Sequence, residues 1–349
     1  MTLESAAAGV FARSRGFLSL AAIGALALTA CSPASGEATD GSTVDADAAG
    51  GGETVTVEDD HGTHEINLDE VDSIGAFDNR SFRTLQEFGV ELDVAAQSLM
   101  NDEAHGEYVN DENILDTGNH REPNLEQVVA AEPDLVINGQ RYAQYYNNID
   151  DLLPEESVIL EFDEGTQDPE EFFEGLAEKT EALGAVFQAE DEAQGLVTEM
   201  TDAMGRVEAA YDGESTVMGL LTSGGDINYA GPNQGRGVAP IFQEFGLQPA
   251  LEVDDQSSDH QGDDISVEAI AQSDPDWIMV LDRDGMAPDD PEYTPAQELI
   301  AESPALQDVT AVEEDQIVYM PQNFYQTEDI QAYTEFLNDF ADELEGAQQ

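Results

Sequence analysis

The feature that most constrains this chain is a pattern that occurs twice, offset by 142 residues (Glu126 to Glu268, Arg141 to Arg283). The copies read LEQVVAAEPDLVINGQR at 125–141 and VEAIAQSDPDWIMVLDR at 267–283. Each contains a Glu, a Pro-Asp seven positions later, an apolar run, and an Arg eight positions after the Pro. A helix followed by a buried strand fits both copies, so the pattern predicts two similar α/β units.

The segments before each copy support two similar halves. A hairpin over 54–68 and a strand over 71–78 precede a helix that ends in LQEFGVEL. In the second half the strand TVMGLLTSGG precedes the helix APIFQEFGLQP, and in both helices the Gly after Phe is expected to be the C-cap. Alternating helices and apolar strands indicate parallel sheets covered by helices, so we predict an α/β fold of two Rossmann-like lobes with parallel-rich sheets.

A long helical segment separates the two halves. Apolar residues follow helical spacing through 168–211, with an expected break near 184–189. Such a helix is a stiff spacer, so the predicted organisation is an N-terminal lobe over 53–167, a long rigid linker helix over 168–211 and a C-terminal lobe over 212–349. A last amphipathic helix is expected over 327–345.

The first 31 residues are typical of a secretory leader, because Arg13 and Arg15 precede an apolar run that is short for a membrane span. Residues 28–31, Leu-Thr-Ala-Cys, resemble a bacterial lipobox, in which the Cys carries the lipid; the alternative is an ordinary signal peptide with an incidental Cys31. Residues 32–52 are small and polar, which predicts a flexible tether. We therefore expect lipid anchoring through Cys31 at the extracellular face of the cell membrane.

The charge balance excludes one class of partner and marks rare residues. The chain has 77 Asp and Glu against 10 Lys and Arg, a formal net charge of -67. Nucleic acid is excluded, since so few bases cannot neutralise phosphates. In molar salt the Debye length falls to about 3 Å and self-repulsion weakens, so the composition indicates adaptation to a salty environment. Each Arg that such a chain keeps is expected to have a specific structural or functional role.

The two arginines of the doubled pattern are predicted to meet. Ligands bind outside the carboxyl ends of parallel strands, and Arg141 and Arg283 each follow such a strand. If the lobes face each other, both side chains project into one cleft and contact a ligand; the alternative is a structural cap on each lobe. Glu126 and Glu268 lie near helix starts at the lobe tips, where a Glu also suits the helix dipole.

The sequence resembles the substrate-binding lipoproteins of iron-chelate ABC importers, particularly those that bind catecholate-type ferric siderophores. The segments EPDLVINGQR, SGGDINYAGPNQGRG, DHQGDDISVEAIAQSDPDWIMVLDRDG and VYMPQNFYQ carry this resemblance across residues 53–345. It implies a shallow interlobe cleft, small motion on binding, no intrinsic cofactor, and delivery of the ferric siderophore to a permease with its ATPase. It also implies a basic triad of Arg141, Arg236 and Arg283, and a permease-docking pair of Glu126 and Glu268.

The chemistry of these residues fits an anionic chelate. A guanidinium stays charged, binds oxygens with two N–H groups and stacks on aromatic rings, as a ferric tris-catecholate trianion requires. Tyr229 and Tyr325 are candidates for stacking or hydroxyl contacts, and the resemblance makes His260 and Tyr325 candidates for completing the shell of chelated iron. We expect no other metal site and no enzyme. The alternatives are a haem or cobalamin carrier of the same fold and a secreted hydrolase that uses Ser223.

Overall fold

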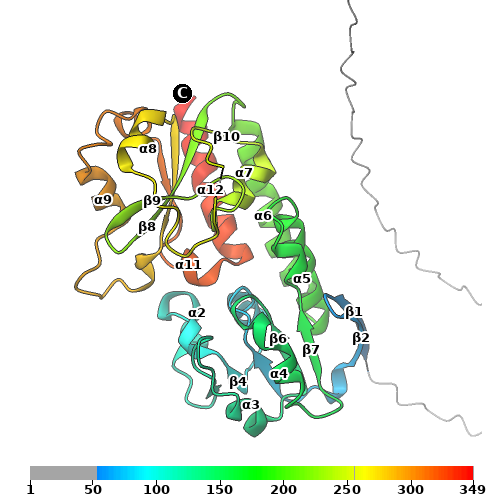
Figure 1. Ribbon diagram of the computed structural model, residues 1–349. Helices are drawn as coiled ribbons and strands as arrows, with labels where there is room; N and C mark the ends of the chain where they lie inside the picture. Colours follow the sequence, from blue (N-terminus) through cyan, green and yellow to red (C-terminus); the bar gives the residue numbers. More distant parts are fainter. Residues whose placement is uncertain (1–52, 255, 349) are drawn as a thin grey trace, which may run out of the picture. The chain divides into compact units, whose positions relative to one another are not determined.

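The computed structural model describes residues 53–254 and 256–348 (Figure 1). The predicted leader, the tether and Cys31 lie outside the described residues. The described part forms two α/β lobes, each built on a five-stranded sheet, and a separate two-stranded hairpin. None of the helices within it is long and apolar enough to cross a bilayer.

The N-terminal lobe is built on a fully parallel sheet with the strand order β5-β4-β3-β6-β7. The predicted hairpin is present, with β1 and β2 paired antiparallel around a turn at residues 60–61. The elements are β1 (Thr54–Asp59), β2 (Gly62–Asn67), η1 (Leu68–Glu70), β3 (Ile74–Ala76), α1 (Phe82–Glu87), β4 (Val94–Ala95), η2 (Gln97–Leu99), α2 (Asp102–Val109), β5 (Leu115–Asp116), α3 (Glu126–Ala131), β6 (Leu135–Asn138), η3 (Gln140–Tyr145), α4 (Tyr146–Asp150), β7 (Val158–Glu161) and η4 (Glu164–Thr166).

The C-terminal lobe is built on the parallel strand order β10-β8-β11-β12, and β9 pairs antiparallel with β8. Successive residues of β11 enter two different buried clusters, as expected for a strand that is covered on both faces. The elements are β8 (Thr216–Ser223), β9 (Asp226–Tyr229), α7 (Ala239–Phe245), β10 (Gln248–Pro249), α8 (Val267–Ser273), β11 (Trp277–Asp282), η5 (Asp284–Met286), α9 (Ala296–Glu302), α10 (Thr310–Glu313), β12 (Ile317–Tyr319), α11 (Phe324–Thr327) and α12 (Ile330–Ala347).

The two copies of the doubled pattern fold alike, as α3–β6 and α8–β11. Each helix ends on an acidic residue in the left-handed region, Glu132 and Asp274, both with φ of 47°. The Asp after each Pro forms hydrogen bonds at the start of the neighbouring strand. Asp134 accepts from the amides of residues 72 and 73, just before β3, and Asp276 accepts from the amide of residue 216, the first residue of β8. The repeated Pro-Asp therefore aligns the strands in both lobes, and with them the strand ends that carry the arginines.

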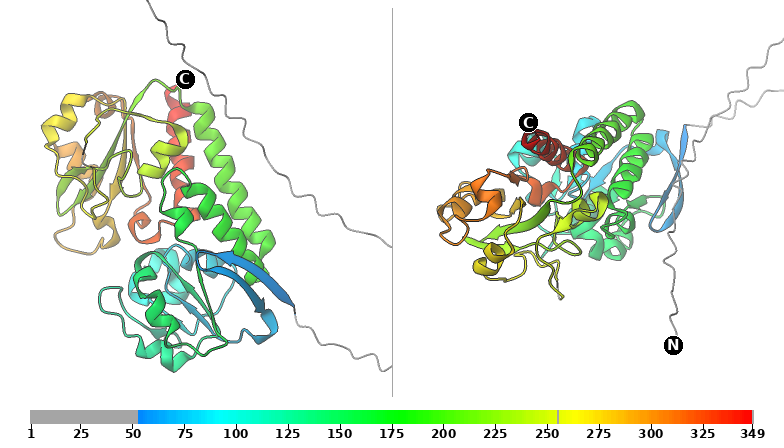
Figure 2. Two further views of the ribbon diagram at one scale, coloured as in Figure 1. Left: turned by 45° about the vertical axis from the view of Figure 1, so that its right-hand side comes forward. Right: turned by 90° about the horizontal axis from the view of Figure 1, so that it is seen from above.

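Residues 168–211, predicted as a long linker helix with a break, form two helices that pack against each other. α5 (Phe172–Val186) and α6 (Glu190–Ala210) are separated at the predicted break, where Gln188 has a φ of 54°. The first turns of α5 belong to the core of the C-terminal lobe, and its last turn belongs to the core of the N-terminal lobe. The 21-residue α6 then packs along α12 (Figure 2). The connection is therefore long and helical, and it packs against the cores of both lobes.

The only lysine of the chain fixes this connection to the N-terminal lobe. Lys179 on α5 forms an ion pair with Asp78, which follows β3, and the two side chains are 4% and 0% exposed. The pair lies beside the buried Asp163, whose pKa is raised by burial and by the charge of Asp78. Lys179 thus neutralises a site where two carboxylates approach each other.

We expect Lys179→Met to lower the free energy of unfolding by about 3–5 kcal/mol, because it leaves a buried carboxylate without its counter-charge. Urea unfolding in molar NaCl measures this change. Arg206→Met is the control and should cost far less, since Arg206 forms an exposed ion pair with Asp342 and exposed ion pairs contribute little to stability. Equal losses in the two variants would contradict the structural role of Lys179.

Candidate functional site

Three arginines surround one tyrosine between the carboxyl ends of the two sheets. Arg141 lies on η3 just after β6, Arg283 directly follows β11, and Arg236 lies in the loop before α7. Their guanidinium carbons lie 5.2, 5.3 and 4.9 Å from the centre of the Tyr325 ring. An aromatic face attracts cations at this distance. The doubled pattern predicted that Arg141 and Arg283 converge, and the structure confirms that placement.

Two cavities open around this cluster. The larger has a volume of about 1350 Å³ and extends toward η4 and the start of α5. The smaller has a volume of about 520 Å³ and includes Tyr325 in its wall. Both are lined by His120, Arg141 and His260, so they adjoin each other, and we call the two together the arginine cleft. The arginines that line it are Arg80, Arg121, Arg141, Arg236 and Arg283.

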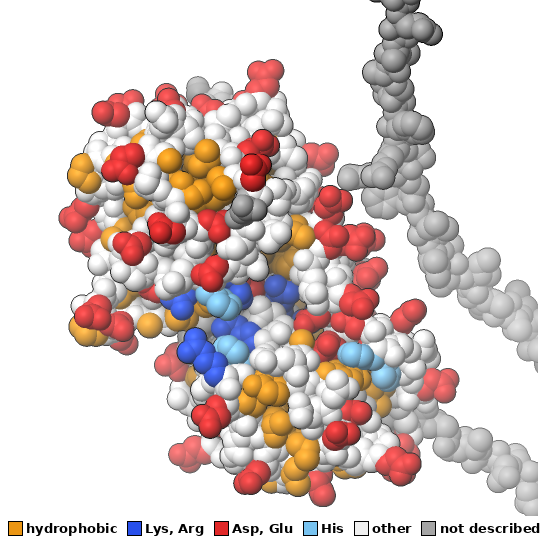
Figure 3. Space-filling model, in the orientation of Figure 1, with side chains coloured by type: hydrophobic (Ala, Val, Ile, Leu, Met, Phe, Trp, Pro, Cys, Tyr) orange, Lys and Arg blue, Asp and Glu red, His pale blue; other side chains and the backbone are white. Residues whose placement is uncertain are grey.

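The arginine cleft gathers most of the positive charge of the described residues. Five of the eight Lys and Arg in this part of the chain line it. Figure 3 shows the blue side chains, with some of the pale blue ones, together in a hollow, while red acidic side chains are spread over the rest of the visible face. A concave site of one charge sign raises the local concentration of ligands of the opposite sign. The cleft therefore suits an anion.

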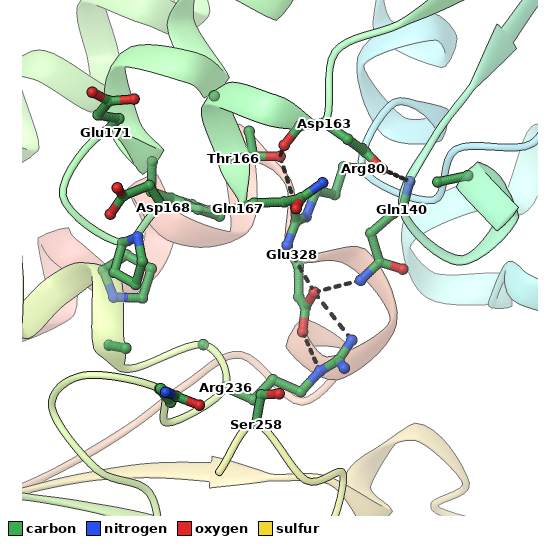
Figure 4. A pocket seen from close by; sticks show the side chains of 18 of the residues that line it. Arg80, Gln140, Asp163, Thr166, Gln167, Asp168, Glu171, Arg236, Ser258 and Glu328 are labelled. Carbon is green, nitrogen blue, oxygen red and sulfur yellow. Dashed lines mark hydrogen bonds and ion pairs between the residues drawn. The ribbon is translucent and has the colours of Figure 1, made fainter. Parts of the chain in front are cut away.

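The buried carboxylate of Glu328 lies in the wall of this basic site (Figure 4). Its Oε1 accepts from Nε of Arg236 at 2.7 Å, and its Oε2 accepts from Gln140 Nε2 at 3.1 Å and from Arg80 at 3.4 Å. Burial would raise the pKa of Glu328, but the charges of Arg236, Arg80 and Arg141 outweigh burial and lower it. Glu328 is therefore ionised at neutral pH.

Several guanidinium donors of the cleft have no partner within the described part of the protein. The Nε–H groups of Arg80, Arg141 and Arg283 are buried and make no hydrogen bond there. Buried donors without an acceptor are costly, so native structures rarely keep them. An incoming ligand with several anionic oxygens would satisfy them.

His260 is held in a defined protonation state beside Arg236. Its Nδ1 lies 3.2 Å from the Arg236 guanidinium and 3.0 Å from the Tyr325 hydroxyl. Because a guanidinium can only donate, Nδ1 accepts and the ring proton lies on Nε2. Burial lowers the pKa of His260, and the charges of Arg236 and Arg141 lower it further. The imidazole is therefore neutral at pH 7.

The structure brings together five of the six predicted ligand-binding residues and excludes one. Arg141, Arg236, Arg283, His260 and Tyr325 all line the arginine cleft. The prediction for Tyr229 is wrong. Its side chain on β9 is packed in the core of the C-terminal lobe, the residue is 1% exposed, and its hydroxyl donates to the carbonyl of Leu251 at 2.6 Å.

The predicted docking residues lie outside the arginine cleft. Glu126 begins α3 and Glu268 is the second residue of α8, and both are exposed. Their placement in equivalent first turns follows from the doubled pattern. Either a partner surface or the helix dipole accounts for a Glu there.

Several residues of the cleft were not predicted from the sequence. Arg80 follows the parallel strand β3, so the rule that selected Arg141 and Arg283 also applies to it. His120 lines both cavities, and its loop gave no periodic signal. Glu328 had no distinguishing signal, because it is one of 77 acidic residues.

The hydrolase alternative does not fit the geometry of Ser223. Its hydroxyl accepts a hydrogen bond from Arg283 at 3.0 Å, which supplies no base to activate it. Within residues 53–254 and 256–348, no group of three His, Cys, Asp or Glu side chains is placed to hold a metal ion. The contacts at the cleft are those of a binding site.

We expect His260 to titrate below the ordinary His value of about 6.5. Arg236→Gln removes a neighbouring positive charge, so it should move the midpoint upward. The Cε1–H proton signals, followed by NMR from pH 4 to 8, measure both midpoints, and Arg206→Gln should leave the His260 midpoint unchanged. An unshifted midpoint in Arg236→Gln would be inconsistent with the contact.

Comparisons with known proteins agree with this geometry. The sequence profile described as periplasmic binding protein matches residues 74–324. The petrobactin-binding protein YclQ of Bacillus subtilis is 24% identical over 245 residues, which cover 70% of this chain and 73% of YclQ. The ferric-anguibactin-binding protein FatB of Vibrio anguillarum is 25% identical over 177 residues, which cover 50% of this chain and 53% of FatB.

A solved structure of similar fold is that of the siderophore-binding protein BauB, bound to a complex between two molecules of acinetobactin and ferric iron. It superposes with a TM-score of 0.70 at 23% identity and covers 84% of this chain and 99% of the BauB chain. The chain described here belongs to the periplasmic binding protein family, whose members are substrate-binding proteins of transporters and not enzymes.

Proposed function

We propose that this chain captures an anionic ferric siderophore, with a catecholate type favoured, in the arginine cleft and delivers it to an ABC permease. The observation that carries the proposal is the convergence of Arg141, Arg236 and Arg283 on Tyr325, in a chain with so few bases. The buried Nε–H donors of the cleft support it, since they match a ligand with many oxygens. The names of the relatives YclQ and FatB support the siderophore class.

The catecholate preference follows from the chemistry of the arginines. A ferric tris-catecholate carries three negative charges on a compact surface of oxygens and aromatic edges. Guanidinium groups bind such oxygens and stack on such rings, and three of them offset three charges in a partly desolvated site. A haem or a cobalamin presents a large apolar or amide-rich surface instead, which a cleft lined by five arginines fits less well.

Iron enters this scheme as cargo carried by the siderophore. His260 and Tyr325 line the cleft and are the side chains that would reach chelated iron if the siderophore left its shell incomplete. Tyr325 is 4% exposed and its hydroxyl is hydrogen-bonded to His260. Contact of either side chain with the iron would therefore require the two side chains to separate.

Delivery places the protein outside the cytoplasm, next to its permease. Lipidation at Cys31 would anchor it to the extracellular face of the membrane, and the tether over 32–52 would let it reach the permease. Glu126 and Glu268 would dock on basic residues of the permease, one from each lobe.

We expect Arg141→Gln and Arg283→Gln each to weaken binding of ferric tris-catecholate about tenfold. Hydrogen bonds to charged groups contribute about 1.5–3 kcal/mol, and 1.4 kcal/mol corresponds to a factor of ten. Calorimetric titration in molar NaCl measures the dissociation constants. Arg206→Gln is the matched control, because Arg206 bonds to α12 on the surface and does not line the cleft.

Failure of the wild-type protein to bind any ferric siderophore in this titration would overturn the proposal. Tighter binding of haem or cobalamin than of ferric siderophores would favour the carrier alternatives. Wild-type affinity in both Arg variants would remove the arginine cleft as the binding site.

We expect the double variant Glu126→Gln, Glu268→Gln to bind the chelate normally but to support little uptake. Removing two surface carboxylates weakens docking on a basic partner surface without changing the cleft. Uptake of radioactive ferric siderophore by cells that rely on this binding protein measures the effect. Glu190→Gln is the control, since Glu190 is also an exposed Glu that begins a helix. Normal uptake by the double variant would contradict the docking role.

A further inference from the structure

Glu328 joins cleft residues from both lobes. Gln140 and Arg80 belong to the N-terminal lobe, Arg236 belongs to the C-terminal lobe, and all three bind the same carboxylate. The residue is 2% exposed, yet its side chain lines the larger cavity. Figure 4 shows Glu328 between Gln140 and Arg236, with dashed lines to both.

The backbone on both sides of this contact adopts an unfavourable conformation. Glu328 has a φ of 45° and Gln140 a φ of 46°, both in the left-handed region. A non-glycine residue there costs roughly 1–2 kcal/mol, and a glycine would avoid that cost. Strain of this kind concentrates at functional sites, where the side chain is needed at that place. Here the two strained residues bind each other through Gln140 Nε2 and Glu328 Oε2.

Glu328 also fixes the orientation of Arg236. The carboxylate accepts from Nε and from one terminal nitrogen of Arg236, at 2.7 and 3.3 Å, and Nδ1 of His260 accepts a hydrogen bond from the other terminal nitrogen. Three of the five guanidinium N–H bonds are then engaged, which leaves two for a ligand. Arg80 is similarly held, by Thr166 at 2.8 Å and by the Phe172 ring at 5.1 Å in addition to Glu328.

A carboxylate in an anion site opposes ligand binding by simple charge repulsion, so its presence requires another explanation. We propose that Glu328 is a positioning residue that holds Arg236 and Arg80 in the geometry that binds the ferric chelate. This inference rests on the proposed function and deepens it. It predicts that the affinity gained by fixing the two arginines is greater than the affinity lost because the carboxylate cancels one positive charge of the cleft.

The first test measures affinity for ferric tris-catecholate by calorimetry. Glu328→Gln makes the cleft more positive, so a purely electrostatic role predicts tighter binding, whereas the positioning role predicts binding about tenfold weaker. Glu328→Asp keeps the charge and tolerates a positive φ better, but its shorter side chain cannot reach both lobes. We expect it to bind several-fold more weakly than wild type. Arg206→Gln, which removes exposed contacts to α12 away from the cleft, should bind normally.

A double-mutant cycle separates positioning from general structural damage. Because Glu328 acts in part through Arg236, Glu328→Gln should weaken binding less when Arg236 is already Gln than it does in wild type. Additive effects of the two substitutions would overturn the proposal, as would unchanged or tighter binding in Glu328→Gln. Urea unfolding of each variant confirms that it is folded before the titration.

A ligand-free measurement keeps the inference testable if the proposed function fails. Because the chain has so few arginines, the Nε–Hε region of a ¹H–¹⁵N spectrum is sparse, and Arg236→Gln assigns the Arg236 signal by its disappearance. In wild type this proton should exchange slowly with water, and in Glu328→Gln it should exchange at least about tenfold faster, while the Arg206 signal stays unchanged. Retained protection of Arg236 in Glu328→Gln would refute the positioning role, whether or not wild type binds a siderophore.

Discussion

The structure depends on bringing scarce positive charges together against their mutual repulsion. Three guanidinium groups share the surroundings of one tyrosine ring, and each interacts with a fixed partner close by: Arg141 with the Tyr325 carbonyl at 2.8 Å, Arg236 with Glu328, and Arg283 with Ser223 and Asp284. These contacts act over a few ångströms. They therefore persist in molar salt, where the Debye length of about 3 Å screens the field of the many surface carboxylates. A cleft built from short contacts suits a chain of this composition.

Chain topology delivers the arginines to this place. In a parallel sheet all strands end at one edge, so a side chain just after a strand lies at that edge. The two Pro-Asp pairs align β6 with β3 and β11 with β8, and Arg80, Arg141 and Arg283 follow β3, β6 and β11. The site is therefore set by strand register in both lobes. Lys179, which is buried where α5 meets the N-terminal lobe, contributes to the site indirectly by keeping that lobe attached to the helical connection.

The sequence predicted the parts of the site that follow from periodicity, and it missed those that depend on tertiary placement. Arg141 and Arg283 were identified because they occupy the same position in a repeat, and α5 and α6 because their apolar spacing is helical. Tyr229 was misplaced because a one-residue step along a strand moves a side chain from one face to the other, and no local signal showed that its face is the core. Glu328 was missed because its role comes from contacts with residues 92 to 248 positions away.

The lobes are held together by more than the cleft arginines. Asn79 donates to the carbonyl of residue 326, Arg80 binds Glu328, and Arg83 forms a two-point ion pair with Asp329. The segment 79–83 after β3 is therefore joined to the segment 326–329 before α12 by several side-chain contacts. All of these contacts are made between groups of the protein itself. A cleft already fixed by them loses little conformational entropy when a ligand binds, so more of the arginine–ligand interaction appears as affinity. The same bonds oppose wide opening of the lobes.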